Sequence, residues 1–367
     1  MSHSDENMTM RINFADESRQ VAEIKVVGVG GAGGNAVNRM ISDRVSGVDF
    51  IAVNTDIQAL DENKAKQCLQ IGKKLTKGLG AGGDPEIGRK AIEENKDLVI
   101  DSLSETDMVF INCGMGGGTG TGAAPVIAEV ARDLGALTVG IVTKPFIFEG
   151  RQRNQRAELG IRELREHVDT LIVVPNQKLL SIVPKNTPLN AAFKTADEIL
   201  MHAVKGISEV INIPGLVNLD FADVKSIMQQ HGEAIMGSGV AEGESRGMEA
   251  AEKAISNSLI EDSSIEGALG VLVNINGGKD LSLNDVNEAL SVIYDAAGDN
   301  ANIIFGAVDN EANSEEIRVT VIATGLGGKS GERNSSENKK SVQTREDNSN
   351  HRIPVLKKLK SEPLAQT

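Results

Sequence analysis

Three glycine-rich segments hold the residues with the clearest chemical potential in this sequence. Segment 114–122 has glycine at six of its nine positions, and segments 28–34 and 77–88 are also rich in glycine. Glycine leaves backbone N–H groups uncovered, and such groups at the start of a helix form a cradle for phosphate oxygens. Each segment alone could be an ordinary tight turn. The three together indicate a ligand that carries several phosphates.

The predicted strands and helices place these segments at one edge of a sheet. Apolar runs predict strands at 23–29, 49–55, 68–71, 108–112, 137–142 and 171–174. The runs are nearly continuous in Val, Ile and Leu, which is typical of a parallel sheet with helices on both faces. Helices are predicted at 35–42, from 124 onward, and after Asp84 and Pro85, which suit an N-cap and a first turn. In this doubly wound α/β architecture every strand-to-helix turn lies at the carboxyl edge, so the glycine-rich segments can line one crevice.

The second half of the chain has a different pattern. Apolar residues at helical spacing predict one long helix over 190–210. Residues 233–324 then show the pattern strand, helix, strand, helix and two more strands, which predicts a smaller two-layer α/β domain. We expect the long helix to link the two domains.

Composition limits the class of protein. The chain has 367 residues, 40% of them hydrophobic, with a polar start and no apolar run long enough to cross a membrane, so we expect a cytoplasmic protein without membrane insertion. The net charge of -14 argues against nucleic acid as a partner. Only Cys68 and Cys113 are present and the five histidines lack metal-ligand spacing, so we expect neither a disulfide framework nor a structural metal site.

Two motifs point to other nucleotide-binding proteins. GVGGAG at 28–33 matches the dinucleotide-binding pattern, so a nicotinamide-dependent Rossmann oxidoreductase is the main alternative. That alternative leaves segment 114–122 without a function, whereas a nucleoside triphosphate can occupy two opposed glycine loops. GGKS at 327–330 resembles the end of a Walker ATPase motif, but Ala323 stands where the leading glycine belongs.

Four motifs in order resemble the FtsZ family, the bacterial relatives of tubulin. They are GVGGAGGNAVNRM at 28–40, GGGTGTG at 116–122, TKPFIFEGRQR at 143–153 and NLDFADV at 218–224. The resemblance runs from Ile24 to Gly325. It implies a tubulin-like fold, GTP binding and hydrolysis, and head-to-tail polymerisation into protofilaments that form the division ring at mid-cell.

The resemblance also implies which residues bind GTP and GDP. The phosphates are expected at Gly31, Ala32, Gly33, Gly34, Asn35, Gly118, Thr119 and Gly120. Glu149 matches the ribose-binding acid and Arg153 a nucleotide-binding arginine; without the resemblance, both belong to a solvated charged turn. Phe193 matches the residue that stacks on guanine, although by itself it would be a core residue. Asn35 and Asp197 match the residues that hydrogen-bond the guanine edge, and a carboxylate suits guanine because N1–H and the exocyclic amine are both donors.

Residues 218–224 contain the catalytic residues that the resemblance implies. Asp220 and Asp223 are expected to polarise the water that attacks the γ-phosphate, with Asn218 in the same loop and Mg²⁺ offsetting the phosphate charge. In the family this loop enters the nucleotide site of the next subunit, so hydrolysis is expected to require assembly. From the residues alone, the two aspartates are a helix-capping pair worth about 1 kcal/mol. A nucleotide-sensing scaffold without catalysis is a further alternative.

Together these observations predict six regions along the chain. They are a flexible N-terminal segment (1–20), a GTP-binding domain (21–189), a central helix with the catalytic loop and the following helix (190–232), a C-terminal α/β domain (233–325), a disordered linker (326–350) and a partner-binding peptide (351–367). HRIPVLKKLK at 351–360 resembles the C-terminal peptide of the family. Residues 351–363 are therefore expected to bind membrane-tethering division proteins such as FtsA.

Overall fold

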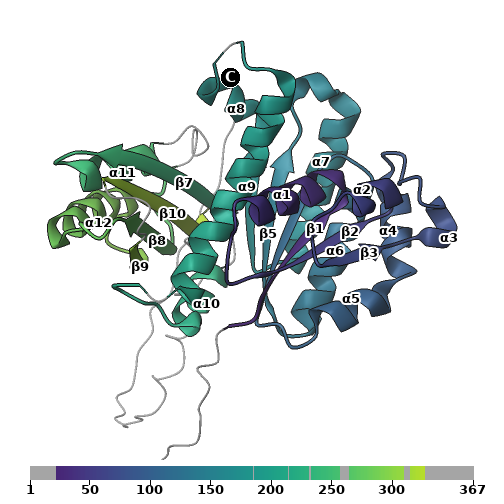
Figure 1. Ribbon diagram of the computed structural model, residues 1–367, viewed down its shortest axis with the longest axis horizontal. Helices are drawn as coiled ribbons and strands as arrows, with labels where there is room; N and C mark the ends of the chain where they lie inside the picture. The colour runs from purple at the N-terminus through teal and green to yellow at the C-terminus, as the bar shows by residue number, and fades with distance from the viewer. Residues whose placement is uncertain are drawn as a thin grey trace, which may run out of the picture. The chain divides into compact units, whose positions relative to one another are not determined.

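One mixed sheet organises the chain. The computed structural model describes residues 22–184, 186–213, 215–230, 233–256, 264–309 and 315–326, so the predicted N-terminal segment, the linker beyond Leu326 and the C-terminal peptide lie outside the described residues. In the described part, ten strands form a sheet in the order β3-β2-β1-β4-β5-β6-β7-β10-β8-β9 (Figure 1). The strands are β1 (Ile24–Val29), β2 (Asp49–Asn54), β3 (Gln67–Gln70), β4 (Met108–Gly114), β5 (Leu137–Lys144), β6 (Thr170–Pro175), β7 (Glu233–Glu242), β8 (Gly270–Gly277), β9 (Asn302–Asp309) and β10 (Glu316–Leu326).

Helices alternate with these strands along the chain. They are α1 (Gly30–Ser42), α2 (Ile57–Asp61), α3 (Lys73–Thr76), α4 (Pro85–Glu93), α5 (Lys96–Leu103), α6 (Thr119–Asp133), the 3-10 helix η1 (Ile147–Glu149), α7 (Arg151–His167), α8 (Asn176–Ile182), α9 (Leu189–Asn212), α10 (Phe221–Met228), α11 (Arg246–Ile255) and α12 (Leu283–Ala297). Among the helices described, none is long and apolar enough to span a membrane.

Strands β1 to β6 pair in parallel, and the central strands β1, β4 and β5 are covered on both faces. Neighbouring residues of β4 show this arrangement, because Phe110 lies in the core shared with α1 and α9 while Ile111 lies in the core shared with α4, α5, α6 and α7. Side chains of successive strand residues point to opposite faces, so a strand buried on both sides is apolar throughout. The predicted doubly wound α/β sheet is confirmed.

The long helix α9 contacts both groups of strands. Its residues Ala203 and Ile207 belong to a core that includes β1, β4 and β5 together with Leu272 of β8 and Ile322 of β10. Helix α9 is slightly longer than predicted at both ends, and its apolar stripe is wide enough to pack on two surfaces.

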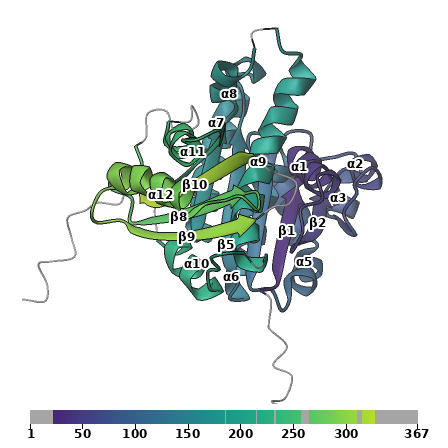
Figure 2. The same cartoon turned by 60° about the vertical axis from the view of Figure 1, so that its left-hand side comes forward.

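Strands β6 and β7 join the two groups of strands into one sheet. They pair in parallel through two residue pairs, Leu171–Glu233 and Ile172–Ala234. Beyond this link, β10 is antiparallel to β7 and β8, while β8 and β9 are parallel. Helices α11 and α12 pack on the face of these strands that does not contact α9 (Figure 2). The predicted smaller α/β layer is present, but its sheet is continuous with the first.

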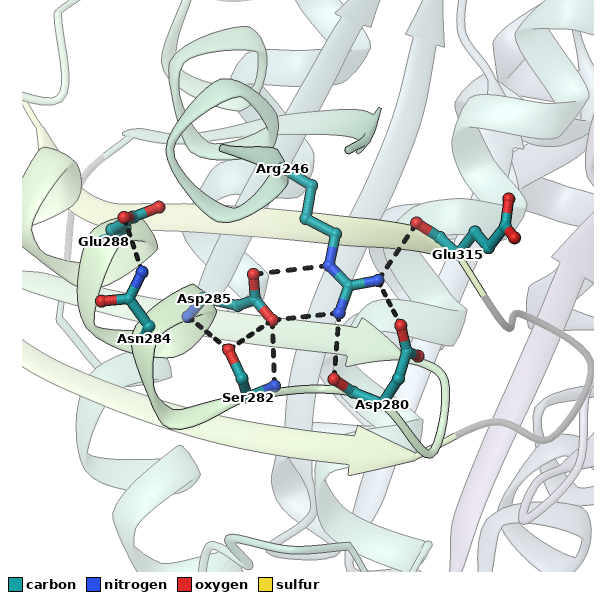
Figure 3. Close-up of polar contacts among 7 residues, drawn as sticks. All are labelled: Arg246, Asp280, Ser282, Asn284, Asp285, Glu288 and Glu315. Atoms are coloured by element: carbon teal, nitrogen blue, oxygen red, sulfur yellow. Dashed lines mark hydrogen bonds and ion pairs between the residues drawn. The ribbon is translucent and has the colours of Figure 1, made fainter. Parts of the chain in front are cut away.

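A buried ion-pair cluster holds α11 against the start of α12 (Figure 3). Arg246 donates to the carboxylates of Asp285 (3.1 Å) and Asp280 (2.6 Å) and to the carbonyl oxygen of Glu315 (3.2 Å). Asp285 also forms a capping box with Ser282 at the start of α12. Burial alone would raise the pKa of Asp285, but hydrogen bonds from Arg246 and Ser282 outweigh burial and hold this pKa below its ordinary value. The cluster therefore fixes two helices with its polar groups paired.

Candidate functional site

The three glycine-rich segments meet at the carboxyl edge of the parallel strands, as predicted from their positions. A Cβ atom placed on Gly30 would lie 3.0 Å from the backbone nitrogen of Gly120, and one placed on Gly118 would lie 2.8 Å from Cβ of Ala81. A Cβ atom on Gly88 would collide with the carbonyl oxygen of Gly118. The segments thus pack backbone against backbone, at distances that only glycine allows.

Two of these segments form the first turns of helices. Helix α1 begins at Gly30 and α6 at Thr119, five residues earlier in each case than predicted at 35 and 124. Their N-cap residues, Val29 and Gly118, make no side-chain capping hydrogen bond. The first-turn N–H groups of both helices therefore lack a side-chain cap, and the helix dipoles favour an anion there.

The predicted phosphate residues of α1 differ in exposure. Gly31 and Ala32 are exposed on the first turn and Asn35 on the second, whereas Gly34 is half-buried and Gly33 is buried. A Cβ atom on Gly33 would collide with the carbonyl oxygen of Asn112 in β4. Gly33 therefore lets α1 lie close to the sheet, whereas the exposed positions face outward.

Around α6 the predicted residues are more enclosed. Gly118, Thr119 and Gly120 are buried at the N-terminus of the helix. The hydroxyl group of Thr119 lies 2.7 Å from that of Thr55, which follows β2. Thr55 was missed in the sequence, although its position directly after a strand places it at the same edge.

Glu149 and Arg153 lie beside the segment that follows β5. Glu149 accepts a hydrogen bond from the N–H of Phe146 (2.8 Å) and forms an ion pair with Arg153 Nε (3.1 Å). The Glu149 side chain is only 12% exposed. Arg153 is half exposed. The carboxylate is therefore fixed in place, which does not fit the alternative of a solvated charged turn.

Phe193 and Asp197 lie on one face of α9, one turn apart. Phe193 contacts Phe146 edge to face, with ring centroids 5.5 Å apart, and remains 37% exposed, so it is not a core residue. Burial raises the pKa of the Asp197 carboxyl to about 7, and nearby Arg39 of α1 opposes this rise. Arg39 also donates to Glu198 at 2.7 Å, which ties α9 to α1.

The predicted catalytic acids lie at the other end of the sheet. Asn212, the last residue of α9, donates to the carbonyl oxygen of Gly47, which precedes β2, so α9 ends at the amino edge. Asn218, Asp220 and Asp223 follow this end. From Phe193 to Asn212, α9 spans roughly 30 Å at 1.5 Å per residue. The structure therefore does not bring the aspartates together with the glycine-rich segments of the same chain.

The loop that carries these acids is ordered by backbone contacts. Asn218 accepts a hydrogen bond from the N–H of Gly215 at 2.6 Å, and Val217 forms a β-bridge with Ala307 of β9. Asp220 is the N-cap residue of α10, but its side chain makes no capping hydrogen bond. The alternative of a helix-capping pair is therefore not supported. In the described part of the chain, no group of three or more His, Cys, Asp or Glu residues could hold a metal ion.

Comparisons with known proteins agree with this geometry. Residues 23–184 match the Tubulin/FtsZ family GTPase domain, and residues 232–327 match the FtsZ family C-terminal domain. A tryptophan-to-tyrosine variant of FtsZ from M. jannaschii superposes with a TM-score of 0.80 at 46% identity, over 83% of this chain and 91% of that chain. The empty FtsZ dimer of M. jannaschii gives the same score and identity, over 83% and 89% of the two chains.

A more distant structure shares the fold. CetZ2 from Haloferax volcanii, as a GTPγS-bound protofilament, has a TM-score of 0.72 at 23% identity, over 83% of this chain and 93% of that chain. None of these matches favours a nicotinamide-dependent enzyme. With two family domains covering most of its length and a relative at 46% identity, the chain belongs to the FtsZ family of tubulin-like cytoskeletal GTPases.

Proposed function

We propose that this chain polymerises head to tail into protofilaments of a cytoplasmic division ring at mid-cell, and that it hydrolyses GTP to GDP and phosphate only when assembled. The observation that carries the proposal is the separation of the two halves of the active site. The phosphate cradle is at the carboxyl edge of the sheet, and the acidic loop is beyond its amino edge.

In this proposal the phosphates of GTP lie on the first turns of α1 and α6. The uncapped N–H groups of these helices fit an anion, and Gly31, where a Cβ atom would meet nothing within 4 Å, lets phosphate approach the backbone. Gly118 lets Ala81 pack closely against the turn before α6. Glu149 binds the ribose and Arg153 binds the nucleotide beside it. Phe193 stacks on guanine, since its ring is already fixed by Phe146. Asp197 accepts hydrogen bonds from N1–H and the amine of guanine.

Hydrolysis uses the acidic loop of the neighbouring subunit. Asp220 and Asp223 of that subunit orient and polarise the attacking water, and Asn218 supports the loop through its bond to Gly215. Mg²⁺, bound with the nucleotide, offsets phosphate charge. The side chain of Asp220 makes no helix-capping hydrogen bond, so its carboxylate remains available to orient the attacking water.

Exposed apolar side chains at both edges support head-to-tail contact. Leu79 (85% exposed), Ile147 (70%) and Phe148 (62%) lie at the carboxyl edge, whereas Leu216 (63%) and Leu269 (47%) lie at the amino edge. Burying these exposed apolar side chains between subunits would remove apolar surface from water and stabilise the contact. Related proteins have been described as an FtsZ dimer and a CetZ2 protofilament.

The remaining parts of the proposal concern the ends of the chain and the domain limits. We place a GTP-binding domain at 21–189, the central helix and catalytic loop at 190–232 and the C-terminal domain at 233–325. Residues 351–363 bind membrane-tethering division proteins such as FtsA through their apolar and basic side chains. Those residues lie outside the described part of the chain.

The test of the shared site is Asp223→Ala. The variant should bind GTP as the parent does, because Asp223 is far from the cradle of its own chain, while GTP turnover should fall roughly 10² to 10⁴-fold. Glu249→Ala, which removes an exposed acid from the first turn of α11, is the matched control and should keep normal turnover. Phosphate release and GTP binding are measured at concentrations above and below assembly, which sedimentation reports.

Two outcomes would contradict the proposal. The first is GTP turnover per subunit of the parent that stays constant down to concentrations at which sedimentation detects only monomers. That result would show that each chain contains a complete active site. Normal turnover of assembled Asp223→Ala would show that this acid is not catalytic. Mixing Asp223→Ala with Gly118→Val, which keeps the acidic loop but loses the cradle, should restore part of the hydrolysis where the two co-sediment.

A further inference from the structure

A pair of buried threonine hydroxyl groups lies at the carboxyl edge of the sheet, beside the proposed phosphate site. One of the two residues, Thr55, has no role in the function proposed above. Thr55 follows β2 and is 0% exposed, while Thr119 is the first residue of α6 and is 8% exposed. Their Oγ1 atoms are 2.7 Å apart. This hydrogen bond connects the end of one strand directly to the start of the helix that cradles phosphate.

The backbone of Thr55 is held on both sides. Its N–H donates to Oδ1 of Asn54 at 2.9 Å, and its carbonyl oxygen accepts from Oγ1 of Thr76 at 3.3 Å. Thr76 is itself held by the carbonyl oxygen of Gly72 at 3.0 Å. The hydroxyl group of Thr55 is therefore presented to Thr119 in a fixed position, and no ordering of this residue is required when a ligand binds.

The number of hydroxyl hydrogens sets the direction of the hydrogen bond. Each hydroxyl group donates one hydrogen and can also accept, whereas an ionised phosphate oxygen only accepts. When phosphate lies against the hydroxyl of Thr119, Thr119 must donate to the phosphate. The bond between the two threonines then persists only if Thr55 is its donor. The result is a chain from Thr55 through Thr119 to phosphate, and such buried chains strengthen each member.

We propose that Thr55 is a positioning residue for the nucleotide, which fixes the hydroxyl group of Thr119 as a hydrogen-bond donor toward phosphate. The inference rests on the proposed placement of the nucleotide at Gly118, Thr119 and Gly120. It adds to the cradle a residue that directly follows strand β2 and does not touch the ligand.

Equilibrium binding of GTP to monomeric protein tests this role. Thr55→Val keeps the shape of the side chain but removes the hydroxyl group, and should weaken GTP about tenfold, the effect of one lost hydrogen bond. Thr55→Ser keeps the hydroxyl group and should bind nearly as the parent does. Thr138→Val is the matched control, since Thr138 is equally buried but donates to the carbonyl oxygen of Ala136 at the far edge of the sheet. It should leave GTP affinity unchanged.

A double-mutant cycle shows whether Thr55 acts through Thr119. Thr119→Val should weaken GTP, and adding Thr55→Val to it should have no further effect, whereas a purely structural role would weaken binding equally in both backgrounds. Thermal melting monitors folding, and Thr55→Ala replaces Thr55→Val in the cycle if the valine variant does not fold.

The outcomes separate this inference from the proposed function. If the parent binds GTP and Gly118→Val does not, while Thr55→Val binds as the parent does, the inference alone is overturned. The inference is also overturned if Thr55→Val weakens GTP binding as much in the Thr119→Val variant as in the parent. If the parent does not bind GTP, the proposed function and the inference fall together.

Discussion

Replacing Asp197 by Asn should change how the stability of the nucleotide-free protein depends on pH. Burial raises the pKa of this carboxyl from 3.8 to about 7 in the folded state. Between these values the unfolded chain releases a proton that the folded chain retains, so the folded state loses stability as pH rises. The cost is absent below pH 3.8 and complete above pH 7, where it reaches roughly 4 kcal/mol at 1.36 kcal/mol per pKa unit.

The assay is denaturant unfolding of parent and Asp197→Asn without nucleotide. The stability of the parent relative to the variant should fall by roughly 2.5 kcal/mol between pH 5 and pH 8, because the amide does not titrate. Asp133→Asn, which replaces an exposed carboxylate at the end of α6, is the control and should follow the pH profile of the parent. Parallel pH profiles for the parent and Asp197→Asn would refute the assignment of a buried, titrating acid.

The same carboxyl links GTP binding to pH. Only the ionised form accepts hydrogen bonds from both N1–H and the amine of guanine, so GTP affinity of the parent should rise as pH increases toward 8. Asp197→Asn should bind GTP more weakly, by roughly 1 to 3 kcal/mol, and without this pH dependence. A variant that binds GTP as tightly as the parent would contradict the role of Asp197 in reading guanine.

Two further predictions concern packing and the ion-pair cluster. Alanine normally stabilises a helix interior relative to glycine, but Gly88→Ala should destabilise the protein by about 1 to 3 kcal/mol and weaken GTP, because its Cβ atom would lie 2.9 Å from the carbonyl carbon of Gly118. Unfolding and GTP titration check this, and a stabilised variant would show that α4 can move away without consequence. Arg246→Met should lower stability by about 3 to 5 kcal/mol by leaving Asp285 buried without its partner, whereas Lys253→Met, at an exposed pair, should have little effect in thermal melting.

The sequence predicted elements best where local signals agree. Helix α12 (Leu283–Ala297) is the second helix of the pattern predicted within 233–324, and its local signals are strong: Ser282 and Asp285 form a capping box at its start and Gly298 follows its end. The glycine-rich segments were placed at the correct edge, and the helix that starts at Pro85 was predicted. The early starts of α1 at Gly30 and α6 at Thr119 were not predicted, because glycine has low helix propensity and tertiary packing outweighs it here. The roles of the individual site residues stay predictions.

Contacts between distant positions could not be predicted from local pattern. The pairing of β6 with β7 involves only two residue pairs and leaves no periodic signal. The hydrogen bond between Thr55 and Thr119 joins residues 64 positions apart, and a threonine after a strand is common. The burial that raises the pKa of Asp197 depends on how α9 lies against α1, which the sequence of neither helix specifies alone.

Helix α9 explains why a chain with this fold needs a neighbour for the proposed hydrolysis. It begins beside the segment that follows β5 and ends at the amino edge, and Leu216 and Val217 then hold the following loop against Ala307 of β9. A loop held there cannot fold back along the roughly 30 Å of helix to its own cradle. The acids can reach a nucleotide only on a second chain whose carboxyl edge faces this amino edge. In the proposed filament such a contact joins unlike surfaces, so each added subunit would present the same free edge again, which is the geometry of an open filament. In the proposed mechanism, every contact within the filament completes one hydrolytic site, while the subunit whose nucleotide faces no neighbour retains its GTP.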